Sequence, residues 1–389
     1  MSKSVLGSKL VSTGLAVFSM LFGAGNLMYP IAVGLSSGAN NVYGMLGFTI
    51  TAVLLPVAGL VAMILFDGDY DEFFQRLGRI PGKISVLLCM LIIGPVLVVP
   101  RIVTLSHVMI APFLPQISPL VFALVFLLVT FLLTFRESKI VDLLGKFISP
   151  LLLASLAVII IKGLWGASDK IVVQNSALEV FKVNLWRGYG TLDLLGAIYF
   201  SAIVINLLKE NFTVNTKKDL DELAFFGFKA GLIGTSLLGI IYWGMSYLGV
   251  FYGQGLEMVN EGEGFREIAF KILSSYGSFI IVIAVLMACL STAIALGAVV
   301  GEYAQRHIFN RKVSFPVSLA IVLLASLPLS IHGLGTVLKL TAGPVMYIAY
   351  PVLIALTFLN IAYKKFGFMP VKIPVLIVAI LTTISYYWT

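Results

Sequence analysis

The chain has 389 residues, of which 59% are hydrophobic and only 11% are charged. Soluble domains carry about a quarter of their residues as charged side chains. The composition therefore excludes a soluble globular protein and indicates an all-α polytopic membrane protein. The net charge of +8 comes from Lys and Arg between apolar runs. No nucleic-acid-binding motif accompanies it, and we expect no nucleic-acid partner.

The first apolar run, residues 10–33, is long enough to cross a bilayer but is interrupted at its centre. Glycine is a poor helix former, and the segment Gly23–Asn26 holds two glycines and an asparagine, with Pro30 soon after. Unwound backbone at membrane depth is tolerated only where it is buried in protein or lines a cavity. The segment therefore predicts a binding site near the membrane midplane. The alternative is that these small residues only allow close helix packing.

The remaining apolar runs predict further spanning helices. We expect eleven in all, near residues 9–34, 43–66, 84–111, 118–135, 146–163, 190–208, 226–251, 278–303, 314–331, 342–363 and 370–388. The segment 332–341 is too short and polar to span, which favours a re-entrant or interfacial turn. Two connections, 164–189 and 252–277, are long. The second carries apolar residues at helical spacing and predicts a short helix over an entrance.

Basic residues set the expected orientation. With the N-terminus in the cytoplasm and helices alternating, most of the 26 Lys and Arg residues fall in cytoplasmic connections. We therefore expect a multi-pass membrane protein with its N-terminus in the cytoplasm. Cys89 and Cys289 both lie in apolar runs, which indicates packing residues and not a disulfide.

The sixth predicted helix repeats a feature of the first. Its run, residues 189–208, carries Asp193 and then Gly196, Ala197 and Ser201 inside an apolar segment. If five helices form one repeat, this helix is the counterpart of the first. Interrupted helices at corresponding places in two halves are typical of transporters built from inverted repeats.

Four segments resemble the branched-chain amino acid:cation symporter family: LFGAGNLMYP, IGPVLVVPRIVTLSH, YGTLDLLGAIYFSAIVIN and ACLSTAIAL. The resemblance covers residues 8–363. It implies the leucine-transporter-type fold, a 5+5 inverted-repeat helical bundle in which helices one and six are unwound around the substrate. One domain, 1–389, would then contain repeat one at about 9–163, repeat two at about 190–363 and a peripheral helix at 370–388. Family members often have twelve helices, and this sequence predicts eleven.

That resemblance implies symport of leucine, isoleucine and valine with a cation, and no enzymatic activity. Backbone N–H groups at a half-helix N-terminus suit the substrate carboxylate. Carbonyls of helix six around 195–197, or Asp193, suit the ammonium. Asp193 lies near the end of its helix, so it could instead face water. The expected substrate site consists of Phe22, Gly23, Ala24, Gly25, Asn26, Asp193, Gly196, Ala197, Tyr199, Phe200 and Ser201.

Helix eight supplies the expected cation site. By resemblance to the same fold, the hydroxyls of Ser291 and Thr292 join backbone carbonyls of Ser19, Phe22 and Ala288 to bind Na⁺. Oxygen ligands suit a hard cation. The alternative is that both hydroxyls bond to their own helix. Coupling to H⁺ stays open, and no other cofactor is expected.

Arg101 is a charged residue inside helix three, between Pro95 and Pro100. It is costly at membrane depth unless it is paired, so we expect a gating pair with a carboxylate or a helix C-terminus. A channel and an intramembrane enzyme are the competing functions. Neither a ring of carboxylates nor a cluster of ionisable residues supports them. The expected partners are a small amino acid and membrane lipid, while the sequence leaves the oligomeric state open.

Overall fold

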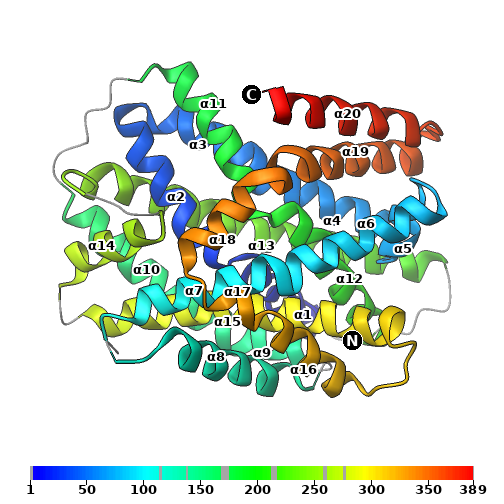
Figure 1. Cartoon of the computed structure of the whole chain (residues 1–389), viewed down its shortest axis with the longest axis horizontal. Coiled ribbons are helices and arrows are strands. Elements are labelled where there is room, and N and C mark those ends of the chain that lie inside the picture. Colours follow the sequence, from blue (N-terminus) through cyan, green and yellow to red (C-terminus); the bar gives the residue numbers. More distant parts are fainter. Residues whose placement is uncertain are drawn as a thin grey trace.

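The computed structural model describes residues 3–113, 116–136, 139–167, 175–211, 217–256, 261–274 and 277–388. Within these ranges every regular element is a helix (Figure 1). A bilayer imposes this result, because a helix satisfies its own backbone hydrogen bonds without water. The expected all-α fold is confirmed, and each of the eleven predicted spans falls on helix.

In the first half of the chain, short turns join successive helices into long bent rods. The elements are α1 (Lys3–Leu21), α2 (Ala24–Ser37), η1 (Gly38–Asn40), α3 (Asn41–Thr49), η2 (Ile50–Leu54), α4 (Leu55–Leu65), α5 (Tyr70–Gln75), α6 (Arg79–Leu91), η3 (Ile92–Val96), α7 (Val98–Ile110), α8 (Pro119–Thr134), α9 (Ile140–Leu143), η5 (Leu144–Ile148) and α10 (Ser149–Trp165).

The second half is built in the same way. Its elements are α11 (Ala177–Arg187), η6 (Gly188–Thr191), α12 (Asp193–Asn211), α13 (Lys217–Tyr252), α14 (Glu261–Leu273), α15 (Ser278–Tyr303), η8 (Ala304–Ile308), α16 (Phe315–Ala325), α17 (Leu327–Ser330), α18 (Leu334–Leu340), η9 (Thr341–Ala349), α19 (Tyr350–Phe366) and α20 (Lys372–Trp388). Figure 1 shows α19 and α20 along one edge of the bundle and α8 and α16 along the opposite edge.

Two predicted connections are helical. The expected loop 164–189 contains α11, which packs against α3 through buried residues such as Val180. The expected turn 332–341 contains α18, which continues through η9 into α19 as one bent helix. Both elements owe their stability to tertiary packing, which an apolar-length criterion does not detect.

Gly-Pro pairs bend two of the long rods. In η3, Gly94 has non-helical angles (φ −93°, ψ −114°) and precedes Pro95. In η9, Gly343 does the same (φ −84°, ψ −134°) and precedes Pro344. A proline removes one backbone hydrogen bond and clashes with the preceding turn. The α6–α7 and α18–α19 rods therefore each have a built-in bend.

The centre of the bundle is formed by α1, α2, α12 and α15. α15 contacts the other three, α1 also contacts α12, and α1, α2 and α12 pack against α13. Their side chains there are almost fully buried, including Phe22 and Ile198 at 0% exposure. Small residues allow these close approaches: a Cβ on Gly34 of α2 would lie 1.9 Å from the carbonyl oxygen of Ser246 in α13. Both interrupted helices thus meet inside the protein, away from lipid.

Candidate functional site

The first helix is broken between α1 and α2. α1 ends at Leu21 and α2 begins at Ala24, with Gly23 in an extended conformation as the N-cap. The Gly23 N–H donates to the side-chain oxygen of Asn26 at 3.0 Å. The break therefore lies at Phe22 and Gly23, and the predicted segment Gly23–Asn26 is corrected: from Ala24 onward it is the first turn of α2. Amides of a first turn have no partner inside their own helix.

A second break precedes α12. Leu192 adopts left-handed angles (φ 61°, ψ 21°) between η6 and α12, a conformation that costs a non-glycine residue about 1–3 kcal/mol. The sequence placed this interruption near Gly196, which is wrong, because α12 runs on unbroken from Asp193. The carbonyls of 195–197 are therefore helix-interior groups. That of Ala197 also accepts the Ser201 hydroxyl at 2.5 Å.

Asp193 links three helices through hydrogen bonds. Its carboxylate accepts the side-chain N–H of Asn26 from α2 at 2.8 Å and the hydroxyl of Tyr242 from α13 at 2.8 Å. Asn26 and Tyr242 also contact each other directly. All three are nearly inaccessible to solvent, at 4%, 2% and 0% exposure. The alternative that Asp193 faces water is therefore wrong for this conformation.

Arg101 of α7 reaches the same region and is 2% exposed. It donates to the carbonyl oxygens of Gly190 at 2.7 Å and Thr191 at 3.3 Å, at the C-terminal end of η6. Its Nε is buried without a hydrogen-bond partner. Among the described residues no salt bridge joins Arg101 to a carboxylate. The expected partner was a carboxylate or a helix C-terminus, and Arg101 contacts the helix C-terminus.

A cavity of about 30 Å³ lies between the two breaks. Polar groups from five elements line it, including Asn26, Arg101, Thr191, Asp193 and Thr292. One water molecule occupies about 10–15 Å³ of such a cavity. A branched aliphatic side chain is larger than the remaining space, so it fits only if the surrounding helices move apart.

The cavity brings together about half of the predicted substrate residues. Those that line it are Gly23, Ala24, Asn26, Asp193, Gly196 and Phe200. Gly25 lies just outside, and a Cβ on it would be 3.3 Å from the Arg101 guanidinium. The rest lie elsewhere. Phe22 packs on Phe18 and Tyr242, Tyr199 stacks near Phe74 and Tyr70, and Ala197 and Ser201 face a separate small cavity beside α4.

The predicted cation site is only partly assembled. Thr292 of α15 donates to the carbonyl oxygen of Met20, in the last turn of α1, at 3.1 Å. It also lies against the break, because a Cβ on Gly23 would be 2.8 Å from its hydroxyl oxygen. Ser291 instead bonds to the Ala288 carbonyl of its own helix at 3.0 Å. Ser19 likewise bonds within α1, to Ala16.

Two tyrosines were missed by the sequence analysis. The Tyr242 hydroxyl donates a hydrogen bond to the Asp193 carboxylate. The Tyr350 hydroxyl accepts a hydrogen bond from the backbone N–H of Leu194, in the first turn of α12, at 3.0 Å. Both are fully or nearly buried. A lone tyrosine in an apolar helix carries no distinguishing pattern, since its ring packs like any other aromatic.

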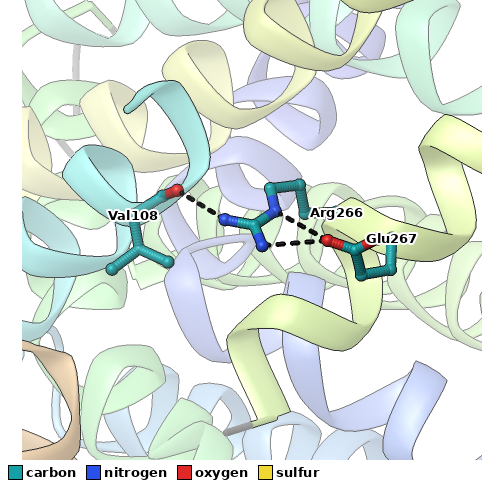
Figure 2. Close-up of polar contacts among 3 residues, drawn as sticks. All are labelled: Val108, Arg266 and Glu267. Carbon is teal, nitrogen blue, oxygen red and sulfur yellow. Dashed lines mark hydrogen bonds and ion pairs between the residues drawn. The ribbon is translucent and has the colours of Figure 1, made fainter. Parts of the chain in front are cut away.

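One end of the bundle is covered by α14, the helix predicted within 252–277. It packs on α2 and α7. Figure 2 shows Arg266 of α14 between Glu267 and the backbone of α7: it donates to the Val108 carbonyl at 3.3 Å and pairs with Glu267 at 2.9 Å. This contact ties α14 to the helix that carries Arg101.

At the other end, α5 packs near the end of α15. Asp71 lies 3.5 Å from His307. Burial raises the pKa of the Asp71 carboxyl, an effect that the nearby His307 partly opposes. The neighbouring pair of Lys364 and Glu72 joins α19 to α5 at 2.9 Å.

Comparison with known proteins gives one family. The family model described as branched-chain amino acid transport protein matches residues 7–387. The chain is 30% identical over 364 residues to the branched-chain amino acid permease BraB of Bacillus subtilis, covering 90% of this chain and 80% of that protein. It is 31% identical over 399 residues to a putative branched-chain amino acid carrier protein of Staphylococcus aureus, covering 96% and 86%.

Solved structures of transporters share the fold. A manganese transporter of Eremococcus coleocola has a TM-score of 0.69 at 15% identity, covering 99% of this chain and 88% of that one. The nucleobase-cation-symport-1 family transporter Mhp1 gives 0.61 at 16% identity, covering 97% and 92%. MhsT in complex with L-phenylalanine gives 0.58 at 16%, covering 95% and 98%. The architecture is thus the leucine-transporter type, a 5+5 helical bundle.

Proposed function

Because the chain belongs to the branched-chain amino acid transport protein family, we propose that it carries leucine, isoleucine and valine across the membrane by symport with Na⁺. It is a secondary transporter and not an enzyme. The observation that carries the proposal is the meeting of two helix breaks, at Gly23 and Leu192, around one buried cavity that holds both Asp193 and Arg101.

The two ends of an amino acid find matching groups there. The first-turn amides of α2, at Ala24 and Gly25, present the positive end of a helix dipole to a carboxylate. The Arg101 guanidinium beside Gly25 adds a full positive charge. Asp193 is the group that takes the ammonium, exchanging its hydrogen bonds to Asn26 and Tyr242 for a charged donor.

The apolar part of the cavity suits an aliphatic side chain. Its lining includes Ile93, Val98, Ile102, Phe200 and Leu296. These walls come from the bent α6–α7 rod, α12 and α15, so outward movement at the Gly94 bend enlarges the site. An apolar wall of this kind favours branched aliphatic substrates, because it stabilises an aliphatic side chain by burying it from water.

Thr292 is the residue that we assign to the coupling cation. Its hydroxyl lies between the end of α1 and the break, within reach of the Met20 carbonyl. Carbonyl and hydroxyl oxygens suit Na⁺. The distribution of the basic residues supports our proposal that the N-terminus lies in the cytoplasm of a bacterial cell.

Uptake into reconstituted vesicles tests this function. Vesicles with an inward Na⁺ gradient are expected to accumulate labelled leucine, with unlabelled isoleucine and valine competing and alanine not. Replacing Na⁺ by choline should stop accumulation, whereas a protonophore should leave it. Accumulation that follows only a proton gradient contradicts the choice of ion, and failure to transport any of the three amino acids contradicts the function.

A further inference from the structure

A large apolar groove lies apart from the candidate substrate site, between the α6–η3 and η9–α19 rods. Its volume is about 400 Å³. Its walls are nearly all hydrophobic and include Leu88, Cys89, Ile92, Val345, Ile348 and Leu353. The groove is more than ten times the size of the central cavity and is bounded by helices that face the bilayer on their outer sides.

The groove opens sideways toward lipid. Leu88 on its rim is 53% exposed, and Pro344 and Ala349 on the opposite rim are also exposed. Its floor is closed by Phe74 and Leu356, which are 2% and 1% exposed. A dry apolar recess with a lipid-facing mouth matches the cross-section and chemistry of a hydrocarbon chain.

Positive charge lies at one end of the groove. Leu77 lines that end, and beside it the Lys372 ammonium is 3.9 Å from where a Cβ on Gly78 would be. The Arg76 guanidinium stacks on the Tyr363 ring at 3.7 Å and donates to the Met369 carbonyl at 3.4 Å. The acidic neighbour Glu72 is already paired with Lys364. An anion at this end would therefore meet a cationic surface.

We propose that the groove binds one acyl chain of an anionic phospholipid, with the phosphate beside Lys372. The chain covers the apolar walls, and the headgroup meets the lysine at the level where α5 and the start of α20 mark the membrane surface. A basic residue near the bilayer surface is expected to favour an anionic over a zwitterionic lipid by about fivefold.

The groove lies next to the bends of both rods. Ile92 and Pro344, both in its wall, lie within two residues of the bends at Gly94 and Gly343. The bound chain thus separates two bent rods close to their hinges. The proposal concerns lipid binding alone and does not depend on the identity of the transported solute.

Photo-crosslinking tests the site directly. The full chain is reconstituted in vesicles with a phosphatidylglycerol that carries a diazirine in one acyl chain, or with the matching phosphatidylcholine, and crosslinked peptides are mapped. The phosphatidylglycerol probe is expected to label the segments around Ile92 and Val345 about five times more than the phosphatidylcholine probe. Lys372→Gln should remove that preference, while Lys365→Gln, which also removes an exposed lysine, should keep it.

A second pair of variants tests the groove itself. Ala349→Trp fills the mouth and should lower labelling severalfold, whereas Leu87→Trp enlarges an exposed residue on the opposite face of α6 and should not. Equal labelling by both probes in the unchanged protein overturns the proposal, as does a Lys372→Gln protein that keeps the preference. Labelling spread evenly over lipid-facing helices such as α8 also overturns it.

Discussion

At the residue scale, Asp193 is a buried carboxylate that accepts hydrogen bonds from neutral donors within the part of the chain that the structure describes. The Asn26 amide and the Tyr242 hydroxyl satisfy its hydrogen bonds, but neither neutralises its charge. Arg101 instead binds carbonyls of η6. A charge inside a membrane protein is costly unless it is paired, and an unpaired one marks a functional site. We propose that the ammonium of a bound substrate supplies the opposite charge.

Asp193→Asn tests this role. Asparagine keeps the shape and can still accept from Asn26 and Tyr242, so the protein should fold. The loss of a buried charge pair with the substrate costs about 2–5 kcal/mol, which corresponds to a decrease in leucine affinity on the order of 100-fold, measured by uptake. Asp142→Asn, at a carboxylate that is 65% exposed, should transport normally. Unchanged leucine affinity in Asp193→Asn rules out the assignment.

Thr292→Ala should act on the cation and not on the amino acid. Removing the hydroxyl takes away one Na⁺ ligand and leaves the Met20 carbonyl in place. We expect the free energy of Na⁺ binding to weaken by about 1.4 kcal/mol, which raises the half-saturating Na⁺ concentration about tenfold. Thr292→Ser keeps the hydroxyl and should restore Na⁺ dependence. The measurement is leucine uptake against Na⁺ concentration. A serine variant as impaired as the alanine variant would argue against a hydroxyl ligand.

Asp71 gives a pH-dependent prediction. Burial raises the pKa of its carboxyl, so the folded state favours the protonated form. Its contribution to stability is then fully present below the unfolded-state pKa and is lost as pH rises through the raised folded-state pKa. Asp71→Asn removes this pH-dependent contribution to stability. The unfolding temperature of the Asp71→Asn protein, relative to that of the unchanged protein, should therefore rise between pH 4 and pH 7. Asp142→Asn controls for the change in net charge. A difference that stays constant with pH contradicts the prediction.

At the element scale, glycine residues allow two helices to pack closely, with the backbone of one helix against a carbonyl of the other. Gly34 lets α2 lie against the backbone of α13 near Ser246. This contact fixes the half-helix whose first turn borders the cavity. It also places Asn26 of α2 beside Tyr242, one turn before Ser246 in α13.

Gly34→Ala should therefore destabilise the protein. The added methyl would lie 1.9 Å from a backbone oxygen, and overpacking typically costs about 1–3 kcal/mol. A drop of several degrees in unfolding temperature is expected, measured by thermal denaturation in detergent. Gly335→Ala in α18, where nothing lies within 4 Å, is the control and should be neutral or slightly stabilising. Equal effects of the two changes would contradict the close packing of α2 and α13.

The contact in Figure 2 predicts the behaviour of α14. Arg266→Ala removes the hydrogen bond from α14 to the Val108 carbonyl of α7. Backbone amides of α14 and of the last turn of α7 should then exchange with solvent several times faster, because local opening becomes easier. Lys271→Ala, on the same helix but bonded to Tyr252 and Gln254, should leave the α7 amides unchanged. Unaltered exchange in Arg266→Ala would show that α14 is held by packing alone.

The sequence predicted those features of the fold that depend on the residues of one helix alone. Apolar length located the spans, and glycine content located the break at Gly23. The break at Leu192 was misplaced because leucine gives no sign of a left-handed conformation that its neighbours impose. Tyr242 was missed because its role depends on a helix 49 residues from Asp193. Ser291 and Tyr199 lie outside the lining of the cavity, because a polar or aromatic residue in an apolar helix does not show by itself which neighbours it will have.

At the scale of the whole molecule, transport requires the central cavity to open to each side in turn. At about 30 Å³ it is closed around little more than water. The α14 contact lies at one end and the α5 contacts lie at the other. The Gly94 and Gly343 bends lie in the two rods that we propose to move. Opening at one end while the other stays closed gives alternating access around a fixed site.

The structure of the protein with bound leucine and Na⁺, determined by electron cryomicroscopy, tests the central claim most directly. We predict that leucine lies between the two breaks, with its carboxylate at the amides of Ala24 and Gly25 and its ammonium within hydrogen-bond distance of Asp193. Leucine bound elsewhere, or bound there with Asp193 still held by Asn26 and Tyr242, would contradict it.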